Sequence, residues 1–166
     1  MARFLSLFLC LLIVASGAAI AAGKILFAAG TWSAIDRGGV CIAAGRSAKI
    51  AAKGKVQAIA GFTFAADRRR WGEFHTQLSR ATRAGSSVIL TIGNQPFLLT
   101  ARGDWAWSRG ASQEQAIIAA VRAATGMRIE ARDAAGNRFT DPYALDGAPT
   151  AIDAAAAACA GKIERL

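Results

Sequence analysis

The sequence has few of the residues on which catalysis and metal binding usually depend. Its 166 residues include one histidine, three cysteines and one tyrosine, and 19% of the residues are charged. Acid–base and nucleophilic catalysis need titratable groups that converge on one point, and a structural zinc site needs four cysteine or histidine ligands. No serine lies in a Gly-x-Ser-x-Gly turn. The sequence therefore predicts no catalytic residues, no metal site and no cofactor.

The one long hydrophobic run is at the N-terminus. Arg3 is followed by apolar residues 4–20, and the run closes on the small-x-small sequence Ala19-Ile20-Ala21. A single cation, a short apolar core and a small-x-small exit are typical of a secretory signal peptide. We therefore expect residues 1–21 to be removed on export, which leaves 22–166 as a single β-rich domain. The alternative is a retained membrane anchor, although about 17 residues is the short end of what a spanning helix needs.

Cysteine is scarce as well, which restricts the possible pairings. Cys10 lies in the predicted signal peptide, so the exported domain keeps Cys41 and Cys159. Disulfides persist in oxidising compartments, and we expect these two cysteines to form one bridge that encloses most of the domain. In the chain-entropy model such a bridge contributes up to about 4–5 kcal/mol.

Acidic residues are outnumbered by basic ones. The chain has 20 lysines and arginines against 11 acidic residues, a formal net charge of +9. A basic protein in the periplasm or outer envelope is attracted to lipopolysaccharide phosphates, anionic lipid headgroups and acidic glycans. Nucleic acid, which the same charge would attract, is not among the partners that we expect. The simpler interpretation is that the positive charge only keeps the domain soluble.

Glycine, in contrast, is abundant, with 17 residues. It separates short apolar or alternating stretches, a pattern typical of a β-rich domain. Turns at 37–39, 93–95 and 135–137 are suited to connecting antiparallel strands. Strands are expected at Lys24–Phe27, Trp32–Asp36, Val40–Ala43, Val56–Ala65, Phe74–Arg80, Ser87–Ile92, Phe97–Ala101 and Met127–Ala131.

Two helices are expected among the strands, near 112–125 and 149–160. The first begins with Ser112, and a glutamine three positions later completes the pattern of a capping box. The second begins near Pro149, runs through an alanine tract and ends at Gly161. The residues after it are expected to fray. The predicted fold class is mainly β, with β-sandwich-like antiparallel sheets and two packed helices.

The surface motif with the clearest chemistry is a run of three arginines followed by tryptophan, Arg68 to Trp71. Arginine binds phosphate or carboxylate in a bidentate manner, and tryptophan can stack on a sugar, a base or a guanidinium. We predict an anion-binding patch formed by Arg68, Arg69, Arg70 and Trp71. The alternative is a solvated loop whose Trp71 covers the edge of the sheet. Three lysines are expected to approach from the other end of the same strand pair: Lys49, Lys53 and Lys55.

His75 and two further tryptophans allow other interpretations. His75 follows Phe74 in a predicted strand, so we expect it on the exposed side while Phe74 points inward. As an alternative, His75 with Glu73 could supply acid–base groups. Trp105 and Trp107 are two residues apart and would face one side of a strand, which we interpret as core rather than as a ligand platform.

The exported chain resembles the invasion-associated locus B family of proteobacterial proteins. The resemblance runs through Gly30-Thr31-Trp32, Cys41-Ile42, Phe97-Leu98-Leu99, the helix from Gln113 to Ala124, Gly136, Asp141 to Gly147, and the closing helix with Ala151 and Cys159. Members often carry a cysteine where this chain has Asp36, so a second disulfide is not expected. The resemblance implies a β-sandwich-like exported domain without catalytic residues. It alone suggests a host-cell surface as a partner, because some members are associated with entry into host cells.

These observations predict a non-enzymatic periplasmic or envelope-associated protein. Its partner would be an anionic envelope polymer, a lipid headgroup or an envelope protein, bound through Arg68–Trp71. One alternative is an envelope enzyme of an unrecognised kind centred on His75 and Glu73. Another is a purely structural partner in an assembly.

Overall fold

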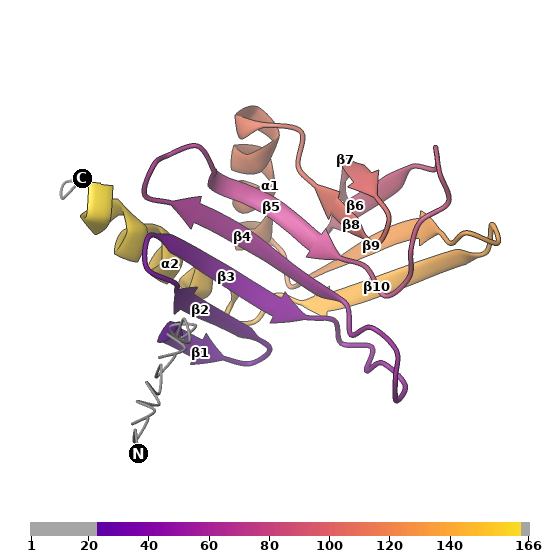
Figure 1. The fold of residues 1–166 in the computed structure, drawn as a ribbon, viewed down its shortest axis with the longest axis horizontal. Coiled ribbons are helices and arrows are strands. Elements are labelled where there is room, and N and C mark those ends of the chain that lie inside the picture. The colour runs from indigo at the N-terminus through magenta and orange to yellow at the C-terminus, as the bar shows by residue number, and fades with distance from the viewer. Residues whose placement is uncertain (1–22, 164–166) are drawn as a thin grey trace, which may run out of the picture.

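The computed structural model describes residues 23–163, so the predicted signal peptide lies outside the described residues (Figure 1). Ten strands form one sheet in the order β1-β2-β3-β4-β5-β8-β7-β6-β9-β10, and every adjacent pair is antiparallel. The elements are β1 (Lys24–Ala29), β2 (Trp32–Asp36), β3 (Val40–Arg46), β4 (Ile59–Ala65), β5 (Trp71–Gln77), β6 (Val88–Ile92), β7 (Gln95–Arg102), β8 (Trp105–Trp107), α1 (Ala111–Ala123), β9 (Gly126–Arg132), β10 (Arg138–Ala144) and α2 (Ala148–Ile163).

The sheet curls so that its last strand returns to its first half. The backbone N–H of Ala48 and the hydroxyl of Ser47 both donate to the carbonyl oxygen of Pro142 on β10, at 2.8 and 2.9 Å. The indole N–H of Trp32 on β2 donates to the carbonyl oxygen of Ala144 at 2.8 Å. In Figure 1, β9 and β10 emerge from behind the right-hand ends of β3–β5 and run on to the right. The predicted mainly β, sandwich-like fold with two helices is confirmed.

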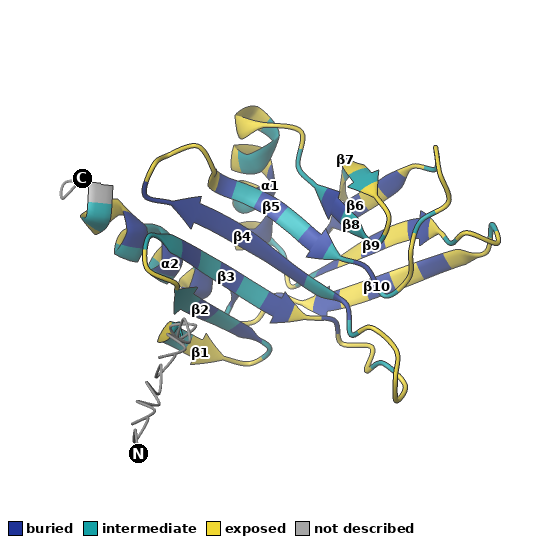
Figure 2. Cartoon of the chain, viewed as in Figure 1, coloured by how far each residue is buried: buried dark blue, intermediate teal, exposed yellow. Residues whose placement is uncertain are grey.

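Both helices pack against this curved sheet, α2 against β1–β4 and α1 mainly against β5. Alternate strand residues point inward, as the two-residue repeat of a strand requires, and they join the apolar faces of the helices in one core. Its largest fully buried side chains include Trp32, Phe62, Phe74, Ile117 and Ile152. Strand β4 is buried along almost its whole length (Figure 2), because its inner face packs in the core and its outer face carries the small residues Gly61 and Thr63, against which His75 of β5 packs.

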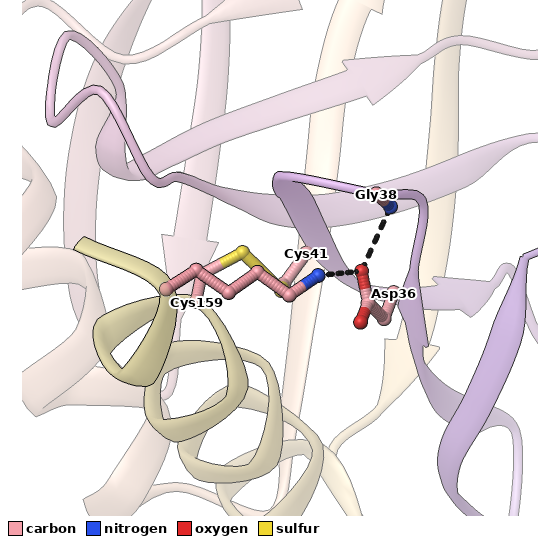
Figure 3. Close-up of a disulfide and its surroundings, with 5 residues drawn as sticks. Asp36, Gly38, Cys41 and Cys159 are labelled. Carbon is pink, nitrogen blue, oxygen red and sulfur yellow. Dashed lines mark hydrogen bonds and ion pairs between the residues drawn. A yellow bond between two sulfur atoms is a disulfide. The ribbon is translucent and has the colours of Figure 1, made fainter. Parts of the chain in front are cut away.

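The predicted disulfide between Cys41 on β3 and Cys159 on α2 is confirmed, with both residues 0% exposed and their Cα atoms 5.8 Å apart (Figure 3). Asp36 is directly opposite Cys41 in the β2–β3 register. Its Oδ1 accepts hydrogen bonds from the Gly38 N–H and from the Lys162 ammonium, one helical turn beyond Cys159. The expectation that the chain frays after residue 161 was therefore wrong for Lys162. An ion pair next to the disulfide therefore attaches α2 to β2, beside the covalent tie between α2 and β3.

Two strands were missed and several boundaries differ. Strand β10 contains Pro142, which argues against a strand in the sheet interior; the proline is accommodated because β10 is an edge strand. Strand β8 has only three residues. Residues 56–58 belong to a loop rather than to β4. Ser112 does not cap α1, whose N-cap is Gly110 with φ 107°, and no side chain caps the helix.

Candidate anion-binding site

The predicted patch lies at the turn that joins β4 to β5. The Ala65 N–H donates to the Arg70 carbonyl oxygen at 2.7 Å, and the Arg68 N–H donates to the Ala65 carbonyl oxygen at 2.9 Å. Arg68 has φ 57°, a left-handed conformation that is uncommon for a residue with a side chain. The tight turn places all three arginines at an exposed tip of the sheet.

Trp71 belongs to β5 and not to the loop, because Gly72 with φ 84° forms an irregularity that lets Trp71 pair with Phe64. Its ring meets that of the buried Phe64 edge-on, with centroids 5.4 Å apart at 83°. The guanidinium carbon of Arg68 lies 5.6 Å from the Trp71 ring centroid, which is within the range of a cation–π contact. Trp71 therefore contacts the core on one side and carries Arg68 on another, while 36% of it stays exposed.

The charges of the turn are only partly balanced. Arg69 lies 4.0 Å from Asp67, and both side chains are largely exposed, so this pair contributes little. Glu73 follows on β5; burial raises the pKa of its carboxyl group, Arg70 opposes the rise, and Glu114 adds to it. Within residues 23–163, Arg68 and Arg70 have no ion pair.

An apolar cleft of about 470 Å³ adjoins the turn. Phe64 and Trp71 form one wall, and Ile118 of α1 forms the other. Arg122, which also lines the cleft, is paired with Asp153 of α2. A ligand held at the arginines could therefore place an apolar part against α1.

The three lysines do not join this patch. They lie in the loop between β3 and β4. This loop enters β4 at the end opposite to the turn that carries Arg68, Arg69 and Arg70. Seven residues of strand separate the two ends by about 20 Å. Lys49 and Lys55 instead line a separate cleft of about 520 Å³ together with Arg80, Asp133 and Asp141.

Asp141 is a feature of that second cleft that sequence reasoning missed. It is 1% exposed, and its Oδ2 accepts a hydrogen bond from the Ser79 N–H at 2.9 Å. Its Oδ1 has no partner among the described atoms. An aspartate between an exposed threonine and a proline gives no signal in the sequence, because its burial results from the return of β10 to the first half of the sheet.

His75 lies on the outer face of β5, and Phe74 points into the core, as predicted. Its Nδ1 is 3.3 Å from the Thr63 hydroxyl oxygen, and burial lowers its pKa, which favours the neutral imidazole at pH 7. The imidazole lies 6.3 Å from the ring of Trp105, with an angle of 25° between the planes. Glu73 shares this outer face.

The interpretation of Trp105 and Trp107 as core side chains was wrong. Ala106 between them points inward and is 0% exposed, so both tryptophans lie on the outer face beside His75. Their rings are 6.3 Å apart and nearly parallel, with 17° between the planes. Alternation in the sequence shows that two residues share a face, but only the pairing with β5 decides which face is inside.

Comparisons with protein-family models, with curated proteins and with solved structures find no match to this chain. The resemblance to the invasion-associated locus B family therefore stays a prediction. Among residues 23–163, no group of three or more His, Cys, Asp or Glu side chains is arranged to hold a metal ion. No helix in this part of the chain combines the length and the apolarity needed to span a bilayer.

Proposed function

We propose that the protein is a non-enzymatic, exported domain that binds an anionic component of the cell envelope through Arg68, Arg69, Arg70 and Trp71. One observation carries the proposal: a left-handed Arg68 holds its guanidinium over Trp71 at the edge of an apolar cleft. Unfavourable backbone conformations persist where surrounding structure maintains them, and they cluster at functional sites.

The charge and shape of this turn suit an anion that carries an apolar or cyclic part. The turn and the start of β5 carry three guanidinium groups against two carboxylates, those of Asp67 and Glu73, so the turn keeps a net positive charge. Guanidinium groups bind phosphate or carboxylate oxygens through two parallel hydrogen bonds. The rest of the ligand would contact Trp71 and Ile118 in the adjoining cleft.

Replacing the three arginines together with alanine tests this proposal. We expect the triple variant to elute from a phosphate or sulfate matrix at lower salt than the wild type, because three contacts that depend on charge are lost. The matched control is K49A/K53A/K55A, which removes the same charge from the opposite end of β4. Equal shifts in the two variants would mean that only net charge matters, and an unchanged elution of the arginine variant would also contradict the proposal.

The perturbed pKa values of Glu73 and His75 favour a second candidate, an enzyme acting on envelope glycans. Perturbed titratable groups that share one surface are characteristic of functional sites. Here the pKa of Glu73 is raised and that of His75 is lowered, both mainly by burial, and His75 contacts the Thr63 hydroxyl. A glycan hydrolysis screen of the wild type and of His75→Ala separates the candidates: an activity lost only in the variant supports the enzyme.

A further inference from the structure

A second group of arginines, which the sequence does not reveal, gathers at the turn between β9 and β10. Arg132 and Arg138 are directly opposite each other in the antiparallel pair, and both are exposed on its outer face. Arg132 Nη1 donates to the Gly136 carbonyl oxygen at 2.9 Å. From a different loop, Arg83 reaches the same glycine: a methyl group on Gly136 would lie 3.6 Å from Arg83 Nη1. Three segments therefore bring three guanidinium groups to one turn.

The nearby carboxylates are already engaged by other cations. Glu130 is paired with Arg128 at 3.1 Å, and Asp133 is paired with Arg80 at 3.0 Å. Asp133 also accepts hydrogen bonds from the backbone N–H groups of Ala135 and Asn137. Within the described part of the chain, Arg83, Arg132 and Arg138 have no acidic partner. Like charges directly opposite in a sheet are destabilising, so an external anion would relieve this arrangement.

Exposed aliphatic side chains lie on the same face of the sheet. Ile89 on β6 and Leu98 on β7 are directly opposite each other, and they are 38% and 41% exposed. Ile89 is also directly opposite Glu130, two residues from Arg132. A shallow cleft of about 300 Å³ adjoins both groups, lined by Ile89, Arg132 and Arg138 together with the hydroxyl-bearing Ser87 and Thr140 and with Glu130, whose carboxylate is paired with Arg128.

We propose that this arginine–aliphatic face, formed by Arg83, Ile89, Leu98, Arg132 and Arg138, docks the protein on a membrane surface with anionic lipid headgroups. The arginines would bind headgroup phosphates, and the aliphatic pair would enter the boundary between headgroups and acyl chains. A soluble acidic polymer would use the arginines alone and would give no role to the exposed Ile89–Leu98 pair. The inference rests on the proposed function only in taking an anionic envelope component as the ligand. It adds a second surface, for lipid headgroups, to the site proposed at Arg68–Trp71.

The test is a co-sedimentation assay with vesicles. The protein is recovered from the periplasm of an expressing host, and its N-terminus is established by sequencing. It is then mixed, in about 0.1 M salt, with vesicles of phosphatidylcholine alone or of phosphatidylcholine with about 30% phosphatidylglycerol. We expect binding only to the anionic vesicles. R132Q/R138Q should weaken the partition coefficient about twenty-five-fold, because each arginine near an anionic surface contributes about a factor of five. R132K/R138K, which keeps the charge, should retain most of the binding.

Two further variants separate this inference from the proposed function. I89S/L98S should reduce vesicle binding several-fold and leave retention on a phosphate matrix unchanged, because it alters no charge. R68A/R69A/R70A should retain vesicle binding. The inference is overturned if R132Q/R138Q and I89S/L98S both bind vesicles as the wild type does, or if the wild type binds neutral and anionic vesicles equally. Neither result would bear on the site proposed at Arg68–Trp71. Loss of vesicle binding in R68A/R69A/R70A alone would also overturn the inference, while supporting the proposed function. Circular dichroism and thermal unfolding show whether each variant is folded.

Discussion

The two halves of the sheet, β1–β4 on one side and β6, β7, β9 and β10 on the other, differ in what holds them together and in what they expose to solvent. Strands β1–β4 carry α2 on their inner face, and the disulfide and the Asp36–Lys162 pair attach the end of that helix to them. Strands β6, β7, β9 and β10 have no covalent tie among the described residues. They also present arginines and two aliphatic side chains directly to solvent.

The contrast suggests that the first half is the more firmly held part of the sheet, with its proposed anion site confined to the turn after β4, whereas the second half exposes a whole outer face. In the first half, even residues on the outer side of β4, such as Gly61 and Thr63, are buried. In the second half, β9 and β10 alternate strictly between buried and exposed residues. The halves are joined through the pairing of β5 with β8 and by the hydrogen bonds that Trp32, Ser47 and Ala48 donate to β10. Substitutions in the first half should therefore cost more stability than substitutions on the outer face of the second.

The largest effect is expected from removing the disulfide. C41A/C159A should lower the free energy of unfolding by about 2–5 kcal/mol, because the bridge links residues 118 apart in the sequence. Urea unfolding of the wild type and the variant measures the difference. The control is Arg122→Gln, which breaks the exposed Arg122–Asp153 pair and should cost less than about 0.5 kcal/mol. A similar small cost for both would show that the first half is stable without its covalent tie.

The next effect concerns the contact between Gly45 and Trp32, which are directly opposite in the β2–β3 register. A methyl group on Gly45 would lie 2.6 Å from the ring of the buried Trp32. Gly45→Ala should therefore lower the free energy of unfolding by about 1–3 kcal/mol, measured by urea unfolding. Gly161→Ala is the control, because a methyl group there meets no atom within 4 Å and alanine favours the helix. Wild-type stability of Gly45→Ala would mean that Trp32 can move aside.

A smaller effect, which depends on pH, is expected from Asp36. The hydrogen bond from Lys162, and then that from the Gly38 N–H, lower the pKa of this carboxyl group below its ordinary 3.8. The folded state therefore binds the proton less tightly than the unfolded state, and the resulting stability is present above about pH 4–5 and lost as the pH falls through the folded pKa. Asp36→Asn should lower the free energy of unfolding at pH 7 by less than about 1 kcal/mol, since the pair is partly exposed.

Unfolding experiments at pH 7 and at pH 3 check this prediction. The difference between the wild type and Asp36→Asn should shrink on acidification. A difference that stays constant or grows would show that the Asp36–Lys162 pair does not contribute through its charge.

The smallest effect, of opposite sign, is expected on the arginine–aliphatic face. Arg138→Thr removes one member of the Arg132–Arg138 pair and should raise the free energy of unfolding by about 0.2–1 kcal/mol. The gain should be larger at low salt and disappear at high salt, because the repulsion is screened. Chemical unfolding in urea at two salt concentrations measures it. A loss of stability at low salt would mean that the two arginines do not repel each other.

Local patterns were sufficient for much of the fold. Strand β2 was predicted with both boundaries, and the two helices differ from their predicted ranges by one to three residues. Alternation, capping residues and glycine turns act over a few residues, so they can be read from the chain directly. Strand β10, which contains Pro142, and the three-residue β8 were not predicted, because an edge strand with a proline and a very short strand are defined by their neighbours in the sheet.

The candidate sites were less predictable than the fold. Arg68, Arg69 and Arg70 are adjacent in the sequence and could be found there, whereas the contact of Arg68 with Trp71 depends on the positive φ values of Arg68 and Gly72. The Arg132–Arg138 pair depends on the register of the β9–β10 hairpin, and Arg83 joins it from 49 residues away in the chain. The outward position of Trp105 and Trp107 likewise follows from the pairing of β8 with β5.

Composition and short-range order were thus enough to predict a basic, β-rich chain, because these properties belong to single residues or to close neighbours. The disulfide could be predicted only because the expected exported domain contains a single pair of cysteines. The curling of the sheet decided which face each alternating strand turns inward and which arginines meet. Those outcomes result from strand register and from hydrogen bonds between distant segments, such as Trp32 to Ala144, whose free energy exists only once the whole sheet has formed.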